Sequence, residues 1–556
     1  MLLQNLKNDM IKNVKSNKKE DVKVMKKYFL VTAALATTLL LGACSNKDEI
    51  GMKLPNGNDN FITSDVANIT KQQVFDEMVT DAGLSALLDL VDYDVLSTKY
   101  EIDTAKVDSA IDMYKQMYPE FEDFLLAQGF KNEEALRQYL ELNLYREAAA
   151  RAAVTVTDEE IQTAYDEKYK KDEEAESTEE SESTNSEETK EIPTLEEVKD
   201  ELTETLIQNK LTDEFIVATL ATEREAAGFV LTNDFLETQY KEISTTYEES
   251  KETNSSIIAK ITDHEYTVEQ LYDELVPAYG LSDGISLVDE QILEKKYPVD
   301  KKEVKELIDQ FKVAYGTNYY QAMESAGLKT DEEIYNYFKL AQLQDAALAE
   351  AYPITDEMLQ KLYDETLPKI SARHILVADE ETAKEIIAKL DAAEDKEATF
   401  KELAGEYGTD GTKENGGDLG TFGQGEMVAE FENAAYALEV GHYSTEPVKT
   451  QFGYHVIYKY AENEKASFED MKEELEQTAK KQEYTQLRLE TLLIKFRSEA
   501  NFKFTDEFLQ KRYETIVANI EESAAQESAA QESAAQEEAA QEEAAQESAA
   551  QEEAAK

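Results

Sequence analysis

The spacing of apolar residues along this chain predicts helices over most of its length. Two sets of apolar residues recur at intervals of three or four. One set is Val107, Ile111, Tyr114 and Tyr118, and the other is Val304, Ile308 and Phe311. Such intervals place side chains on one face of a helix. Thr157 and Thr355 each precede acidic residues, as expected of a helix N-terminus. We expect most of these apolar faces to be core, although some could instead contact a bound polypeptide.

The two helical patterns belong to an internal repeat. Matching segments keep their order and have nearly constant offsets within each half of the unit. The offset is 197 for 70–78 with 267–275 and for 96–103 with 293–300, and 198 for 156–159 with 354–357. It is 273 for 193–202 with 466–475 and for 229–240 with 502–513. Agreement over such a span indicates two copies of one helical unit, here called copy one and copy two.

The copies differ in the middle, where the offset increases from 198 to 273. Copy two carries an insert at residues 368–462, whereas copy one has residues 171–191, which are mostly Glu, Ser and Thr. Such a composition cannot bury a core. Copy one therefore has the form of the same unit with the insert lost, although residues 171–191 could equally be an ordinary flexible linker.

Within the insert the pattern changes from helical to mixed. Residues 372–377 are largely aliphatic and predict a strand, and residues 453–460 predict a closing strand. The segments between them predict three helices and a glycine-rich loop, at 381–392, 399–407 and 429–438 for the helices and at 408–425 for the loop. The insert is therefore predicted to be an α+β domain.

The N-terminus carries an export signal. Met25-Lys26-Lys27 is followed by the apolar run 28–41 and then by Gly42-Ala43-Cys44. An apolar run of this length before small residues is typical of a secretory signal rather than a membrane-spanning helix. The ending resembles the lipobox of bacterial lipoproteins, which implies a diacylglyceryl group on the Cys44 sulfur and cleavage before it. Because residues 1–24 precede a complete signal, Met25 is the predicted start.

Composition argues against a nucleic-acid partner and against an internal disulfide. The chain has 57 basic and 119 acidic residues, a formal charge of −62, so it repels phosphate backbones and we expect no nucleic-acid partner. Cys44 is the only cysteine, and no internal disulfide is expected.

The tail 521–556 repeats Glu, Ala and Gln, which favour helix. Its five-residue period leaves no continuous apolar stripe, so we predict a solvated helix or a dynamic spacer rather than a coiled coil.

The insert resembles the parvulin-type peptidyl-prolyl isomerases. The motifs that carry the resemblance occur in family order, and they are His374-Ile375-Leu376-Val377, Tyr407-Gly408-Thr409-Asp410, Gly416-Gly417-Asp418-Leu419-Gly420, Phe422, Gly425-Glu426-Met427, Phe431 and Phe452-Gly453-Tyr454-His455. The flanking helical units, the lipobox and the position of the insert resemble the PrsA foldases of Gram-positive bacteria. The resemblance implies a small antiparallel sheet flanked by helices, inserted into a mainly α protein.

The implied reaction is rotation about the X–Pro peptide bond. A peptide bond resists rotation by about 18–20 kcal/mol because the twisted amide loses its resonance, and X–Pro isomerisation takes tens of seconds or more. A site accelerates the rotation by binding the twisted amide better than either planar isomer. This chemistry needs neither nucleophile nor metal, and we predict no cofactor.

The resemblance also implies which residues form the site. The catalytic residues are His374, Asp410 and His455, and the residues of the substrate pocket are Leu419, Phe422, Met427 and Phe431, with Thr450 as a supporting hydroxyl. Simpler roles remain open, because a histidine on a strand is more often a satisfied core residue, Asp410 could be a turn residue, and Met427 and Phe431 could be plain core.

Two departures from the family pattern concern loops. The family often has small hydroxyl residues after the aspartate, whereas this chain has Gly411-Thr412-Lys413, which puts the stiffness of that loop in question. The loop at 378–381 is short and acidic and offers no arginine cluster, so phosphate recognition is not expected. His264 and His442 receive no role.

These observations predict a mainly α protein made of two related helical chaperone-like units. Its segments are a signal peptide 1–43, a lipid tether 44–60, unit one 61–240 with the acidic linker 171–191, a linker 241–256, the first part of unit two 257–367, the parvulin domain 368–462, the second part of unit two 463–520 and the tail 521–556.

The predicted function is that of a foldase held by lipid on the outer face of a Gram-positive cell membrane. Its partners would be unfolded secreted proteins with X–Pro bonds, and the resemblance also allows a homodimer. One alternative is a holdase with a vestigial parvulin domain, and another is a surface adhesin or scaffold. The intact set of His374, Asp410 and His455 favours the isomerase.

Overall fold

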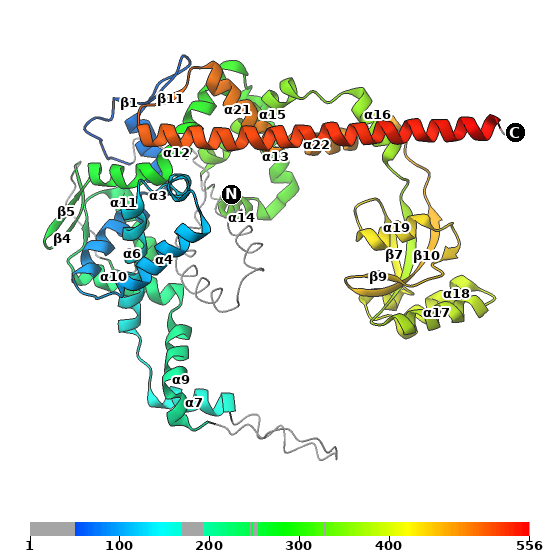
Figure 1. Ribbon diagram of the computed structural model, residues 1–556, viewed down its shortest axis with the longest axis horizontal. Coiled ribbons are helices and arrows are strands. Elements are labelled where there is room, and N and C mark those ends of the chain that lie inside the picture. The colour runs from blue at the N-terminus through cyan, green and yellow to red at the C-terminus, as the bar shows by residue number, and fades with distance from the viewer. Residues whose placement is uncertain are drawn as a thin grey trace. The chain divides into compact units, whose positions relative to one another are not determined.

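The computed structural model describes residues 50–169, 193–244, 246–247, 254, 256–326, 328 and 330–554 (Figure 1). The predicted signal peptide, Cys44 and the acidic linker 171–191 lie outside these residues. The chain divides into two compact units, one formed by residues 1–347 with 489–556 and the other by residues 348–488. Within the described ranges, no helix combines the length and the apolarity that a membrane crossing requires.

The fold is mainly α, and the described helices and strands of the two copies correspond in order, with the short turn η2 of copy two as an addition. Copy one consists of β1 (Asn60–Thr63), β2 (Ile69–Thr70), α3 (Lys71–Ser97), α4 (Thr104–Met117), α5 (Phe121–Gln128), α6 (Glu133–Ala153), α7 (Asp158–Tyr169), α9 (Leu195–Lys210), α10 (Asp213–Ala226), β3 (Val230–Leu231) and α11 (Asp234–Ile243). Copy two consists of β4 (Ile257–Ile261), β5 (His264–Thr267), α12 (Val268–Lys296), α13 (Lys301–Tyr315), the 3-10 turn η2 (Gly316–Asn318), α14 (Tyr319–Ser325), α15 (Asp331–Ala351), α16 (Asp356–Glu365), α20 (Phe468–Glu483), α21 (Gln486–Glu499), β11 (Lys503–Phe504) and α22 (Glu507–Ala554).

The long first helix of each copy begins with the same capping box. The hydroxyl of Thr70 accepts a hydrogen bond from the backbone of Gln73, whose side chain accepts one from the Thr70 N–H at 2.9 Å. Thr267 and Gln270 repeat this arrangement at the start of α12. A capping box satisfies two donors that a helix end leaves without an intrahelical partner. The repeat seen in the sequence is therefore a repeat of local structure.

A helical hairpin flanks the variable segment in each copy. In copy one, α7 and α9 lie on either side of residues 171–191, and the Tyr165 hydroxyl donates to the Pro193 carbonyl at 2.7 Å. In copy two, α16 and α20 flank the insert, and the Tyr363 hydroxyl donates to the Ala466 carbonyl at 3.0 Å. Both hairpins thus keep one stabilising contact, whatever lies between their helices.

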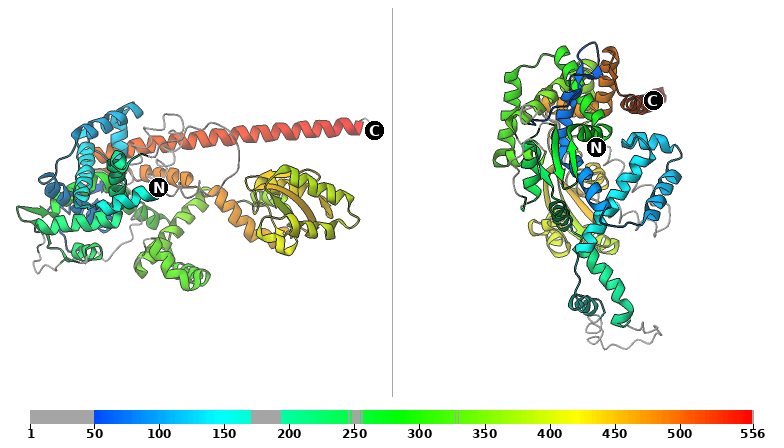
Figure 2. Two further views of the ribbon diagram at one scale, coloured as in Figure 1. Left: turned by 90° about the horizontal axis from the view of Figure 1, so that it is seen from below. Right: turned by 90° about the vertical axis from the view of Figure 1, so that its left-hand side faces the viewer.

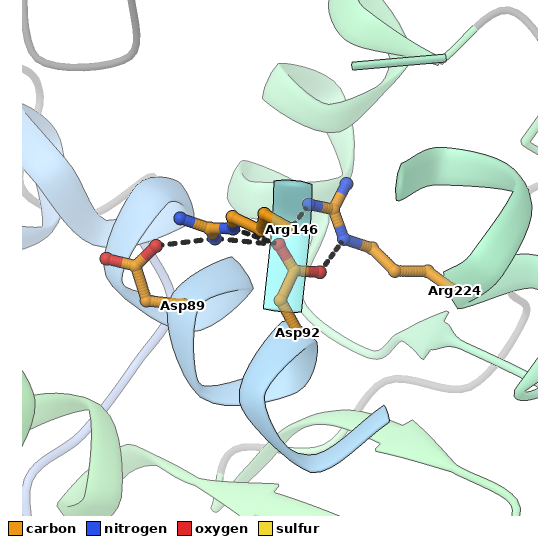
Figure 3. Close-up of polar contacts among 4 residues, drawn as sticks. All are labelled: Asp89, Asp92, Arg146 and Arg224. Carbon is orange, nitrogen blue, oxygen red and sulfur yellow. Dashed lines mark hydrogen bonds and ion pairs between the residues drawn. The ribbon is translucent and has the colours of Figure 1, made fainter. Parts of the chain in front are cut away.

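The first compact unit has a buried ionic cluster in copy one. Asp92 accepts hydrogen bonds from Arg146 at 2.7 and 2.8 Å and from Arg224 at 2.6 and 2.8 Å, and Asp89 pairs with Arg146 at 2.6 Å (Figure 3). Burial opposes ionisation of Asp92, but the two guanidinium groups hold its pKa below the usual value.

Copy two has a reduced form of this cluster. Asp289, equivalent to Asp92, lies 3.0 Å from the Nε of Arg497, which is equivalent to Arg224. Gln344 stands at the position of Arg146. With one guanidinium beside it instead of two, burial raises the pKa of Asp289 to about 7.

The insert is an α+β domain, as predicted. Its antiparallel sheet has the order β7-β6-β10-β8 with β9 paired to β10, and its elements are β6 (Ile370–Val377), α17 (Glu380–Ala392), α18 (Lys396–Tyr407), the 3-10 helix η3 (Gly411–Asn415), β7 (Asp418–Phe422), α19 (Ala429–Ala437), β8 (His442–Tyr443), β9 (Val448–Thr450) and β10 (Gly453–Glu462). Helices α17 and α18 cover one face and α19 covers the other (Figures 1 and 2).

Several sequence boundaries need correction. The predicted loop 408–425 contains η3 and strand β7, because β7 pairs with β6 despite the glycines in and around it. Helix α18 begins at Lys396 rather than at residue 399, since the Asp395 side chain caps it by accepting from Ala398 N–H at 3.0 Å. The tail predicted from residue 521 is helical up to Ala554, as part of α22, which runs without a break from Glu507.

Two further expectations differ from the structure. Helix α11 extends to Ile243, and Tyr247, placed in the predicted linker, packs on the Tyr240 ring with centroids 5.1 Å apart. Phe311 was expected on the buried face of α13 with Val304 and Ile308. Those two are buried, but Phe311 is 37% exposed, at the edge of that face.

Candidate active site

The two central strands place both catalytic candidates on one face of the sheet. His374 lies on β6 opposite Ile457 of β10, and His455 lies two residues earlier on β10, so the alternation of strands points both side chains the same way. Ile375 and Val456 belong to the opposite face, where they pack with α17 and α18. Phe431 of α19 meets the rings of His374 and His455 edge to face, with centroids 5.7 and 5.2 Å away.

A glycine turn brings the aspartate to this face. Gly416 and Gly417 have φ values of +68° and +74°, which residues with a side chain rarely adopt. Gly417 lies so close to β6 that its carbonyl accepts a hydrogen bond from His374 N–H at 2.8 Å, and a Cβ on Gly417 would be 2.1 Å from the His374 carbonyl oxygen. The close approach fixes η3, and with it Asp410, beside His374.

The polar side chains form a continuous chain of hydrogen bonds. His374 Nε2 is 3.1 Å from Asp410 Oδ2, His374 Nδ1 is 3.0 Å from His455 Nδ1, and His455 Nε2 is 2.9 Å from Thr450 Oγ1. A carboxylate only accepts, so His374 Nε2 carries the proton and its Nδ1 is the acceptor. His455 Nδ1 therefore donates to His374, and Thr450 donates to His455 Nε2. This order assigns one tautomer to each neutral imidazole.

The surroundings keep both imidazoles neutral at physiological pH. Burial lowers the pKa of His374, an effect that the neighbouring Asp410 opposes. Burial and the adjacent His374 lower the pKa of His455 to about 4. Asp410 is partly buried, but His374 and the hydroxyl of Thr412 hold its pKa below the usual range. The site therefore presents one carboxylate and two neutral imidazoles.

Thr412 is a site residue that sequence reasoning missed. Its hydroxyl is 3.0 and 3.1 Å from the two Asp410 oxygens and 3.1 Å from His374 Nε2. The sequence indicated only a departure from the family pattern after Asp410. A hydroxyl two residues beyond the aspartate was the available signal, but the 3-10 turn that folds it back could not be seen in a glycine-rich segment.

The predicted pocket residues lie next to this polar chain. Phe422 and Phe431 are buried in the core under α19, whereas Leu419 and Met427 pack against that core and remain partly exposed. Thr450 is buried and bonds His455. Of the predicted pocket residues, Leu419 and Met427 therefore keep exposed surface, whereas the two phenylalanines are covered.

Asp418 fixes the strand that carries Leu419. Its Oδ1 accepts hydrogen bonds from Gly420 N–H and the Tyr460 hydroxyl, both at 2.9 Å, and its Oδ2 lies 3.2 Å from Arg373. Asp418 appeared in the sequence only as part of a motif. The structure shows that it ties β7 to the neighbouring strand β6 and to β10.

The domain is also recognised by comparison with known proteins. Residues 371–461 match the family model described as the PPIC-type PPIASE domain. Foldase protein PrsA of Geobacillus kaustophilus is 40% identical over 257 residues, which make up 46% of this chain and 89% of that protein. The chain belongs to the PrsA foldase family. It therefore carries a parvulin-type peptidyl-prolyl isomerase domain.

Other PrsA foldases give the same coverage. Foldase protein PrsA 2 of Listeria monocytogenes is 34% identical over 257 residues, 46% of this chain and 86% of that protein. The crystal structure of PrsA from Bacillus cereus has 33% identity and a TM-score of 0.33, and it covers 47% of this chain and 99% of that one. Each of these PrsA foldases thus matches less than half of the present chain, which contains two copies of the helical unit.

Proposed function

We propose that the parvulin domain of this PrsA-family chain is catalytically active, with His374, His455 and Asp410 surrounding the carbonyl of a rotating X–Pro bond. The observation that carries the proposal is the continuous hydrogen-bond chain from Thr450 to Asp410. A domain kept only as a vestige has no need to retain all four groups, whereas a site that binds a twisted amide needs them fixed before the substrate arrives.

The proposed mechanism is preferential binding of the twisted amide. Leu419 and Met427 hold the proline ring by apolar contact while the preceding carbonyl rotates past the imidazole pair. Because every ring nitrogen and the carboxylate already have partners, these groups act by orientation and electrostatic complementarity rather than by transferring protons. Groups held in place in this way need not reorganise during the rotation.

The helical units are proposed to hold unfolded clients. In copy one, Tyr114 and Tyr118 stack on Phe124, with centroids 5.3 and 4.3 Å away. In copy two the residue at the position of Phe124 is Ala322, and α13–α15 expose a set of large apolar side chains, namely Phe311, Val313, Tyr315, Tyr320 and Tyr337. Exposed aromatic groups of this kind support contact with apolar segments of secreted proteins.

The proposed location is the extracytoplasmic face of the membrane, with lipid on Cys44. This proposal rests on the signal and lipobox pattern and on membership of the PrsA family. Labelled palmitate should enter the intact chain expressed in a Gram-positive host and should be lost from the Cys44→Ala variant. Equal labelling of both chains would rule out this anchor.

A protease-coupled proline-peptide assay on the full chain tests catalysis. Asp410→Asn should lower kcat/KM by about tenfold to a hundredfold, because a charge-assisted hydrogen bond to His374 is replaced by a weaker one. Asp395→Asn in the same domain is the matched control, since asparagine also caps helices and the rate should not change.

The alternative of a non-catalytic holdase makes the opposite prediction. A folded chain that prevents client aggregation but gives no rate above the uncatalysed one would establish the holdase and refute the isomerase. Retention of client protection in Asp410→Asn, with loss of rate, would show that the two activities are separate.

A further inference from the structure

The two small sheets of the first compact unit are each built from both copies. Strand β11, from the end of copy two, pairs with β1, from the start of copy one. Strand β3, from the end of copy one, pairs with β4, from the start of copy two. Figure 1 shows β11 beside β1 and the β4–β5 hairpin of the second sheet. Each copy therefore gives its last strand to the first hairpin of the other.

The two exchanges have the same register. Ile62 faces Phe504 in one sheet, and the equivalent residues Ala259 and Leu231 face each other in the second. The bonds beside the strands repeat as well. Thr505 N–H donates to the Phe61 carbonyl at 3.0 Å, and the equivalent Thr232 N–H donates to the Ile258 carbonyl at 3.0 Å. Such reciprocity is the mark of an isologous interface, in which the same surface is used by both partners.

The long helices meet along the same axis. Helices α3 and α12 pack against each other, and Phe75 of α3 meets Tyr272 of α12 edge to face with centroids 6.0 Å apart. Phe75 and Tyr272 occupy equivalent positions in the two copies. Contact between a residue and its own equivalent places both near a rotation axis, and with the reciprocal exchange of strands it indicates that the copies are related by a local two-fold.

Further contacts bury the interface between the copies. The Tyr266 hydroxyl of copy two donates to Asp94 of copy one at 2.9 Å. A Cβ on Gly284 of α12 would be 2.9 Å from the Cδ1 atom of Ile62 and 3.2 Å from the Phe61 ring, both in copy one. The helix of one copy thus lies directly on the hairpin of the other, and a side chain added at Gly284 would have to displace Ile62.

We propose that the surface through which a copy of this unit binds another such unit is occupied within the chain itself. The partner that the surface fits is the second copy, and the chain closes its own two-fold interface. The protein is therefore monomeric, with one isomerase domain for two mutually dependent helical units. This inference does not depend on whether the isomerase is active.

Two measurements on the full chain test the proposal. Light scattering should give the mass of one chain across a range of protein concentrations, and the mass of two chains would overturn closure within the chain.

In the second measurement, a site-specific protease sequence is introduced between Tyr247 and Asn254 and cleaved in the folded protein. The two fragments should still elute together in native buffer and separate only in urea. Fragments that separate in native buffer, each still helical, would show that the copies are independent.

A matched pair of substitutions locates the contact. Gly284→Val in the cleaved chain should lower the urea concentration at which the fragments separate, because the new side chain meets Ile62 and Phe61. Gly405→Val in α18 is the control, since a Cβ there meets only the Lys413 carbonyl oxygen at 3.9 Å. Fragments of the two variants that separate at the same urea concentration would contradict the proposal. If Gly284→Val does not fold, cleavage of the unsubstituted chain still tests whether the two copies remain associated.

Discussion

At the scale of single residues, the site depends on which ring nitrogen holds a proton. Asp410 at one end and Thr450 at the other determine the direction of every hydrogen bond between them. A change at either end therefore reaches the far histidine. The neutral state of both rings is as important as their position, because a second proton on His455 removes the acceptor that Thr450 needs.

The isomerase rate should be constant from about pH 6 to pH 8 and should fall below about pH 5. The reason is that burial and His374 lower the pKa of His455 to about 4, so this imidazole takes up a proton only in acid. Between that pH and the ordinary histidine value the unfolded chain binds more protons, so the stability of the domain should also decrease as pH falls. A pH–rate profile with ¹⁵N spectra of the imidazoles checks this, and a rate that follows a pKa near 6.5 would contradict it.

The resemblance implied His374, Asp410 and His455 as a set because short motifs carry them in order, and the structure brings the three side chains into contact. It did not reveal Thr412, whose contact depends on a 3-10 turn between two glycines. Nor could sequence spacing separate Leu419 and Met427 from Phe422 and Phe431, since exposure depends on how α19 crosses the sheet.

At the scale of elements, the turn before β7 is the most constrained segment of the domain. Gly417 combines a positive φ with contact to the β6 backbone, and the bond from His374 N–H depends on both. The turn therefore links the stability of the fold to the geometry of the site. Strand β7 could not be predicted because it lies in a glycine-rich segment and glycine is rare in strands, whereas the helices were predicted from apolar periodicity.

Gly417→Ala should destabilise the domain by about 3 kcal/mol or more, because the residue is strained at positive φ and its methyl group collides with the His374 carbonyl. Gly441→Ala is the control. It also has a positive φ, of +87°, but a Cβ there meets nothing within 4 Å. Thermal unfolding should show a clearly larger loss for Gly417→Ala than for Gly441→Ala, and similar losses would mean that only the backbone angle matters.

At the scale of the whole molecule, the two copies are similar in fold but unequal in energetics. The offsets in the sequence predicted the repeat, since helices and their caps are local. They did not predict the exchange of strands, because β3 and β11 are two residues long and their pairing is decided by distant parts of the chain. The difference in energetics lies in the buried ionic clusters, because two arginines lie beside Asp92 and one lies beside Asp289.

Asp92→Asn should cost about 3–5 kcal/mol, because it leaves Arg146 and Arg224 buried without their counter-charge. Asp289→Asn should cost less than about 1 kcal/mol at pH 8, because burial already raises the pKa of Asp289 to about 7 and so disfavours its charged form.

The two aspartates should also differ in pH dependence. The Asp289 contribution is fully present below about pH 4 and is lost as pH rises through about 7, whereas the Asp92 contribution is lost only in acid. Urea unfolding at about pH 5.5 and pH 8 measures both, and equal costs for the two substitutions would contradict the difference between the clusters.

The paired hairpins have a consequence for how such chains evolve. The Tyr363 bond to Ala466 joins the two helices at the base of the insert, and the Tyr165 bond to Pro193 does the same where the insert is replaced by an acidic run. Each hairpin thus holds together the two chain ends between which the variable segment lies. Closing a loop twice as long costs only about 0.6 kcal/mol more. A whole domain can therefore be lost from between the two helices, or another domain inserted there, without repacking the helical scaffold. Selection can then change the number of active sites on the scaffold independently of the helical surfaces that are proposed to hold the client.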